Sequence, residues 1–115
     1  MKTKKLAESI TAALEESKAN KITALDVRHL TSITEIMIIA SGTSNRQVRS
    51  IAERVIEAAK AIGVKPLGIE GEKQGEWVLV DLGDVVVHVM HPATRDYYQL
   101  EKLWTMEVSR ASTTI

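Results

Sequence analysis

Two β-branched runs separated by four turn-forming residues restrict the fold more than any other feature of this sequence. Trp77–Val80 and Val85–Met90 are rich in valine, which favours strands. Residues 81–84 (DLGD) lie between them. Leu82 is a poor first residue for a two-residue mirror-image turn, so a type I turn with Gly83 in the left-handed conformation is expected. The stretch therefore predicts an antiparallel β-hairpin.

Apolar periodicity elsewhere in the chain alternates between the helical and the extended pattern. Ser44 and Gln47 have the S-x-x-Q spacing of a capping box, which predicts a helix start, and Gly63 supplies its stop. The expected elements are a helix over 3–18, strands over 22–27 and 35–40, a helix between Ser44 and Gly63, a short strand within 64–69, the two hairpin strands, and a helix that begins at Pro92.

This order of elements predicts one domain with a single β-sheet. The helix-linked crossover over residues 35–69 favours a parallel pair, whereas the hairpin is antiparallel. We therefore expect an α/β or α+β fold, with a mixed sheet of about five strands packed with helices. A chain of 115 residues suits one domain, here 1–108, and the small polar residues 109–115 (RASTTI after Ser109) are expected to form a flexible tail.

The composition excludes several classes of site. The chain has no cysteine, which rules out disulfides, thiolate metal ligands and cysteine nucleophiles. Its basic start (MKTKKLAESITAALEES) has no continuous apolar segment, so no signal peptide is expected. No apolar run approaches the roughly 20 residues that span a bilayer. We expect a soluble, cytoplasmic protein without a membrane partner.

The formal net charge is zero, but the charges are unevenly distributed. Residues 1–21 hold five lysines against three glutamates, whereas residues 70–84 hold five acidic residues against one lysine. A protein that binds nucleic acid through phosphates usually has a positive excess. An acidic stretch that includes Trp77 therefore indicates a basic protein partner, or a cation, rather than DNA or RNA.

Two pairs of polar residues in the hairpin are candidates for chemistry. His88 and His91 are three residues apart, which on a strand places them on opposite faces, so a hydrogen-bonded sheet histidine is favoured over a metal site. Asp81 and Asp84 flank the turn and would lie close enough to hold a cation or act as acid and base. Aspartate is also a common turn residue because its carboxylate accepts backbone N–H groups, and we favour that role.

A strand followed by Ser41-Gly42 and a helix is also similar to nucleotidyltransferases. Those enzymes need paired carboxylates, usually as D-x-D on the next strand, and this chain has no D-x-D. An enzyme of this type would have to use Ser44, Arg46 and a non-standard acid such as Asp81. We favour a capped core helix here, and we expect no catalytic, cofactor or metal site.

The last helix carries two adjacent tyrosines. Tyr97 belongs to its apolar stripe, whereas Tyr98 is rotated from that stripe by about 100°. Together with Trp77 and Leu82, Tyr98 would make an exposed aromatic and aliphatic patch of the kind that marks protein interfaces. The alternative is that Tyr98 covers the edge of the sheet.

Taken as an ordered set, these segments resemble the ribosomal silencing factor family, also called Iojap-like proteins, over roughly residues 4–105. The ordered set is specific, above all through Glu70-Gly71, WVLVDLGDVVVHV and LEKLW, whereas each piece alone is a weak signal. The matching blocks are Ala24–Val27, Ser32–Thr34, Ser41–Val48, Leu67–Gly71, Trp77–Val89, Arg95, Tyr98 and Leu100–Trp104.

The resemblance implies a function that the residues alone do not reveal. Members of this family bind the large ribosomal subunit through large-subunit ribosomal protein fourteen, block its joining to the small subunit, and lower translation when nutrients are scarce. The family fold is similar to that of nucleotidyltransferases but is not known for that catalysis, and free members are often homodimers. The resemblance therefore implies a regulator that is not an enzyme.

We combine the family pattern with the chemistry of the hairpin into a site hypothesis. Trp77 and Leu82 are expected as apolar contacts with the ribosomal protein. Asp81 and Asp84 are expected to shape the turn and to face basic groups, and Tyr98 is expected to extend the patch from the helix. The enzyme described above and a plain oligomerisation module remain the alternatives.

Overall fold

The computed structural model describes residues 2–29, 31–32 and 34–98 of the chain. Their order of helices and strands is the predicted one, and most element ends lie within two residues of the expected positions. The elements are α1 (Lys2–Glu16), β1 (Asn20–Asp26), β2 (Ile36–Ser41), α2 (Asn45–Ala61), β3 (Gly68–Glu70), β4 (Trp77–Asp81), β5 (Val85–Met90) and α3 (Pro92–Tyr98).

The strands of the described residues form one mixed five-stranded sheet in the order β1-β2-β5-β4-β3. β2 and β5 are parallel, and the other neighbouring pairs are antiparallel. The predicted mixed sheet packed with helices is therefore confirmed. The expected parallel pairing across the α2 crossover is wrong: β2 and β3 run in the same direction, but β5 and β4 lie between them.

The burial of each strand explains this order. Five of the six residues of β5 are buried, which suits a strand with neighbours on both sides and side chains packed on both faces. β3 has only three residues and begins two residues after Pro66, which has no N–H to donate to a ladder. β3 therefore lies at the edge of the sheet, and the hairpin partner β4 separates it from the centre.

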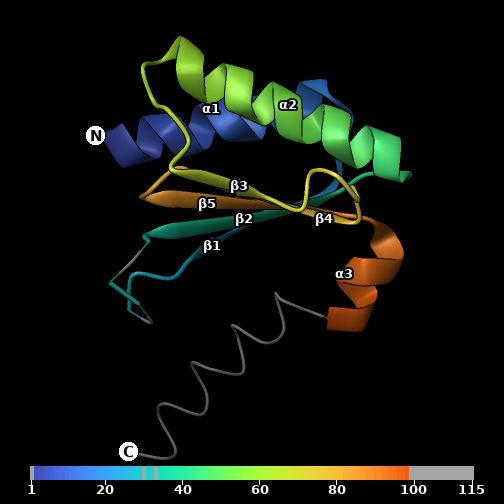
Figure 1. Cartoon of the computed structure of the whole chain (residues 1–115). Helices are drawn as coiled ribbons and strands as arrows, with labels where there is room; N and C mark the ends of the chain where they lie inside the picture. Colours follow the sequence, from blue (N-terminus) through green and yellow to red (C-terminus); the bar gives the residue numbers. More distant parts are fainter. Residues whose placement is uncertain (1, 30, 33, 99–115) are drawn as a thin grey trace, which may run out of the picture.

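Helices α1 and α2 cover one face of the sheet, as Figure 1 shows. The main core lies between these helices and the sheet, where alternate strand residues point toward the helices. Its members include Leu6, Ile10 and Leu14 of α1, Val48, Ile51 and Val55 of α2, and Ile38, Ala40, Val78, Val80, Val85, Val87 and Val89 of the sheet.

A second, smaller cluster occupies the opposite face of the sheet. It consists of residues that alternate in sequence with those of the main core, so both faces of the central strands are apolar. The members are Val27, Met37, Ile39 and Met90, with Leu25 and Trp77 packed against them.

The start of α2 follows the predicted cap only in part. Ser44 Oγ accepts the N–H of Gln47 at 3.1 Å, as expected. The Gln47 side chain, however, accepts from the N–H and the hydroxyl of Thr43, at 2.5 and 2.6 Å, instead of from Ser44. Gly42 leaves little space for a side chain here, since a Cβ would lie 3.0 Å from both Cγ2 and the backbone nitrogen of Val48.

Helix α3 begins at Pro92, as predicted, and lies at the end of the sheet away from the N-terminus of α1 (Figure 1). The Nδ1 atom of His91 accepts the N–H of Ala93 at 3.3 Å and so caps the helix. The LEKLW block of the resemblance, the expected domain boundary at residue 108 and the tail 109–115 lie outside the described residues. None of the described helices is long and apolar enough to span a membrane.

A buried arginine attaches α3 to the sheet. Arg95 is 6% exposed, and its guanidinium donates to Ser41 Oγ at 2.8 Å and to Thr23 Oγ1 at 3.3 Å. These bonds join the last described helix to β2 and β1, which are 54 and 72 residues earlier in the chain. The sequence patterns gave Arg95 no structural role, because its partners are so distant.

Two left-handed glycines differ in how much an alanine substitution should lower the free energy of unfolding. Gly63 (φ +84°) ends α2 in open space, whereas a Cβ on Gly71 (φ +81°) would overlap the carbonyl oxygen of Trp77. We expect Gly63→Ala to lower the free energy of unfolding by about 1 kcal/mol through backbone strain alone. Gly71→Ala should lower it by about 3 kcal/mol or more, because the clash is with backbone. Equal losses in urea denaturation would contradict this account.

Candidate functional site

The turn between β4 and β5 is shaped by an aspartate side chain. Asp81 Oδ1 accepts the N–H of Gly83 at 2.9 Å, and Gly83 has φ +87°. The N–H of Leu82 donates to the carbonyl of Val85 at 2.9 Å and closes the turn. The predicted left-handed Gly83 and the turn-forming role of Asp81 are therefore confirmed.

Asp84 connects this turn to the rest of the fold and remains exposed. Its Oδ2 atom accepts the hydroxyl of Thr3 at 3.1 Å. Its carbonyl accepts the N–H groups of Glu35 and Ile36 at 2.9 and 3.0 Å, where β2 begins. The turn is thus held by backbone bonds on its inner side, while its outer side presents a carboxylate to solvent.

Leu82 does not lie on the surface, so the expectation that it belongs to an exposed patch is wrong. It is 5% exposed and belongs to the main core. The exposed apolar residue beside the turn is Leu67, which is 76% exposed. Its N–H donates to the carbonyl of Asp81 at 2.7 Å. The sequence signal for Leu67 is a leucine between Pro66 and Gly68, in a connecting segment that has few ways to bury it.

The other end of the hairpin carries an aromatic pair. Trp77 is half-buried, and its Nε1–H donates to Nδ1 of His88 at 2.9 Å, with ring centroids 5.9 Å apart. His88 is 5% exposed, and burial lowers its pKa to about 4. The favoured interpretation of His88 as a hydrogen-bonded sheet histidine is confirmed. The bond fixes the indole ring against the sheet.

The hypothesised interface residues fall into two groups. Trp77 pairs with Met90, and Asp81 pairs with Val86, so they mark opposite ends of β4. Four residue steps along the strand place them roughly 13 Å apart. One end therefore carries the acidic turn beside Leu67, and the other carries the Trp77–His88 pair near the start of α3. The side chain of Tyr98 lies outside what the structure describes.

The residues of the enzyme hypothesis do not form one site. Ser44 and Arg46 follow the end of β2 that is level with Met90 of β5. Asp81 is level with Val86, at the other end of the sheet. Over the described ranges, no group of three or more histidine or acidic side chains is placed to hold a metal ion.

Comparison with known proteins identifies close relatives. A family model described as "Ribosomal silencing factor during starvation" matches residues 1–114. A ribosomal silencing factor of Chromobacterium violaceum is 55% identical over 92 residues, which cover 80% of this chain and 75% of that protein. A crystal structure of a protein from Chromobacterium violaceum superposes with a TM-score of 0.89 at 50% identity, over 91% of this chain and 88% of that one.

A more distant relative comes from the mouse. The protein named "Mitochondrial assembly of ribosomal large subunit protein 1" is 31% identical over 102 residues, which cover 86% of this chain and 45% of that protein. The printed names of these relatives describe ribosome silencing and ribosome assembly, and they state no catalytic activity.

The buried His88 predicts that stability depends on pH. Because its pKa is about 4 in the folded state and 6.5 ordinarily, the unfolded chain binds the proton more readily between these values. The stabilisation is complete above about pH 6.5 and is lost as pH falls to about 4, by about 3 kcal/mol in total.

Urea denaturation at several pH values would measure this loss. His88→Asn offers Trp77 an amide oxygen in place of Nδ1 but cannot titrate, so its stability should fall less steeply below pH 6.5. His29 and His91 are present in both proteins and serve as the internal control. Parallel pH profiles for the two proteins would contradict the assignment to His88.

Proposed function

The chain belongs to the ribosomal silencing factor family, and we propose that it binds the large ribosomal subunit, blocks its joining to the small subunit and represses translation when nutrients are limiting. The observation that carries this proposal is the family match over residues 1–114, together with 55% identity to a named silencing factor. The mouse relative, named for assembly of the mitochondrial large subunit, supports an association with that subunit. Large-subunit ribosomal protein fourteen is the proposed contact, on the resemblance described above.

The proposed mechanism is steric and requires no turnover, nucleotide or metal. A bound protein that occupies the face where the small subunit must dock prevents joining for as long as it stays bound. The fraction of silenced subunits then depends only on the protein concentration relative to the dissociation constant. We place this activity in the cytoplasm, with the free protein as a homodimer.

The acidic turn is the proposed contact for basic groups of the ribosomal protein. Asp84 is exposed and held in place by backbone bonds, so it can meet a cation without a large loss of conformational entropy. Asp81 is half-buried and fixes the turn. We assign Leu82 the role of anchoring the turn from the core, and Leu67 the role of the exposed apolar contact beside it.

The aromatic end of the hairpin is the second proposed contact. Trp77 is half-buried, and its indole N–H is already bonded to His88, so the ring is rigid and part of it is open to a partner. Rigid aromatic side chains are frequent energetic centres of protein interfaces. Tyr98, in the last described turn of α3, is proposed to extend this contact.

Sedimentation with isolated ribosomal subunits tests the function directly. The purified protein is mixed with large subunits and sedimented through sucrose, and small subunits are then added. We expect the protein to travel with the large subunit and intact ribosomes to fail to form. A protein that stays at the top of the gradient would refute the proposal for this chain.

Two substitutions test the proposed contacts. Asp84→Lys and Trp77→Ala should each weaken large-subunit binding by more than about 1 kcal/mol, roughly fivefold, if the residue is an anchor. Glu53→Lys makes the same charge change on the exposed side of α2 and should bind as the wild type does. Trp77→Phe keeps most of the packing of the aromatic ring on the sheet, so it distinguishes the loss of a contact with the subunit from the loss of the fold. Wild-type affinity in both Asp84→Lys and Trp77→Ala would exclude this surface.

A further inference from the structure

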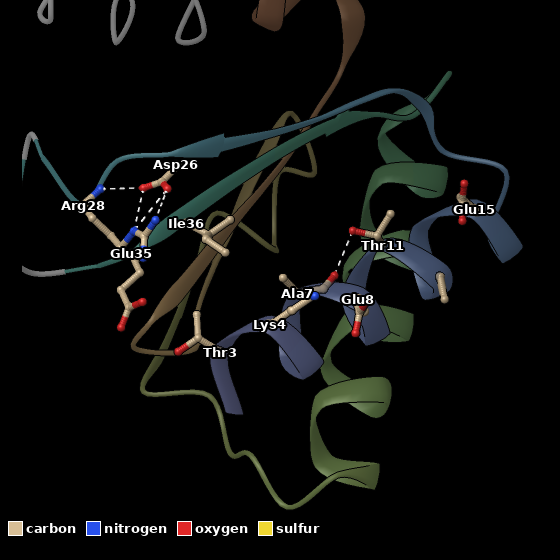
Figure 2. Close-up of a pocket in the computed structure, with 11 residues that line it drawn as sticks. Thr3, Lys4, Ala7, Glu8, Thr11, Glu15, Asp26, Arg28, Glu35 and Ile36 are labelled. Atoms are coloured by element: carbon tan, nitrogen blue, oxygen red, sulfur yellow. Dashed lines mark hydrogen bonds and ion pairs between the residues drawn. The ribbon is translucent and has the colours of Figure 1, made fainter. Parts of the chain in front are cut away.

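An open groove lies between α1 and the β1 side of the sheet, and no role has been assigned to it above. It encloses about 690 Å³ and is bounded by one side of α1, the end of β1 and the start of β2 (Figure 2). The helical layer stops short of β1: Ile38 of β2 is fully buried, whereas its cross-strand neighbour Ala24 is exposed. The edge strand is thus left uncovered on the side that faces α1.

The floor of the groove is made of small and apolar groups. Ala7 and Ala12 contribute only methyl groups from α1, and Ile36 contributes an aliphatic side chain from β2. The hydroxyl of Thr11 donates to the carbonyl of Ala7 at 2.8 Å, so its hydrogen is already engaged within the helix. The groove can therefore accept a chain segment without large desolvation of its floor.

The charges around the groove are mainly negative. Glu8 and Glu15 are exposed on α1, two helical turns or about 10 Å apart. Among the described residues, neither makes an ion pair. Asp26 and Arg28 compensate each other through a contact of 2.6 Å, and Lys4 is the other cation among the described residues of the lining. An occupant with positive charges is therefore favoured, and a phosphate backbone is disfavoured.

The edge of β1 beside the groove carries backbone groups that pair with no other strand of the described residues. The N–H of Val27 donates to the carbonyl of Glu35, toward β2. Because inward and outward groups alternate along an antiparallel strand, the N–H and C=O of Ala24 point away from the sheet. The irregular pairing between Asn20 and Thr23 limits this free edge to the later half of β1. Such an edge can pair with an added strand.

We propose that this groove binds an extended protein segment with alternating basic and apolar residues, which pairs with β1 and places its basic side chains beside Glu8 and Glu15. Because cross-strand neighbours share a face of a sheet, a residue of the bound segment that pairs with Ala24 points toward α1. The residues next to it in the segment point to the other face and extend the apolar surface at Leu25. The site goes beyond the proposed silencing function, and its test uses no ribosomal component.

A synthetic peptide provides the probe. A blocked, fluorescein-labelled peptide of about ten alternating lysine and valine residues is titrated with the full chain at low salt, and its anisotropy is measured. A peptide with glutamate in place of lysine is the control. We expect only the lysine peptide to bind, with an affinity that falls as salt rises. No binding of the lysine peptide, or equal binding of both peptides, overturns the proposal.

Variants of the full chain then locate the site. Glu8→Gln with Glu15→Gln should weaken binding about fivefold, within the range of two exposed charge contacts. Glu53→Gln with Glu57→Gln removes the same charge from the exposed side of α2 and should leave binding unchanged. Ala24→Pro removes an N–H that lies outside the internal ladder and should weaken binding more than tenfold.

Three further outcomes would each overturn part or all of the proposal. Unchanged binding in the groove variants, with circular dichroism showing an intact fold, overturns the site. If Glu8→Gln with Glu15→Gln weakens peptide binding and Ala24→Pro does not, the strand pairing is overturned. If Ala24→Pro changes the mass measured by sedimentation without peptide, the edge is an interface between copies of this chain, and the peptide proposal fails.

Discussion

The two-sided burial of β5 is the constraint on which the rest of this structure depends. A strand with five of six residues buried needs a neighbour on each edge and a packed layer on each face. β2 and β4 provide the edges, and α1 and α2 cover one face. The smaller cluster around Met90 fills part of the other face. Trp77 packs against this cluster and is therefore held on the sheet.

The proposed ribosomal interface and the core are built from the same hairpin. Along β4, Val78 and Val80 face the main core, while Trp77 and Asp81 face the opposite side. The apolar half of the alternation fixes the hairpin under the helices, and the other half leaves Trp77 and Asp81 available for contacts. This arrangement gives the proposed binding surface little freedom to move, which lowers the conformational entropy lost when a partner binds.

Local features of the sequence predicted local structure well, whereas non-local pairings had to come from the structure. The Ser44 cap and the left-handed Gly83 depend on a few neighbouring residues, and both are found. The placement of β5 between β2 and β4, and the burial of Leu82, depend on segments about 50 residues apart. The Trp77–His88 bond needs the hairpin register, since these residues are diagonal neighbours across β4 and β5. The functional proposal rests on the family pattern, because the described residues place no three histidine or acidic side chains to hold a metal ion, and Ser44 and Asp81 lie at opposite ends of the sheet.

The parallel pair of β2 and β5 also sets the order in which this protein can be completed during its own synthesis. Ile36 pairs with Val85, so the middle of the sheet closes only after about 50 further residues have been made. Until then β2 can have only β1 beside it, and α2 lacks the β4 and β5 surface on which it packs. The central strand β5 is therefore made about 50 residues after β2, and its synthesis decides when the earlier segments become stable.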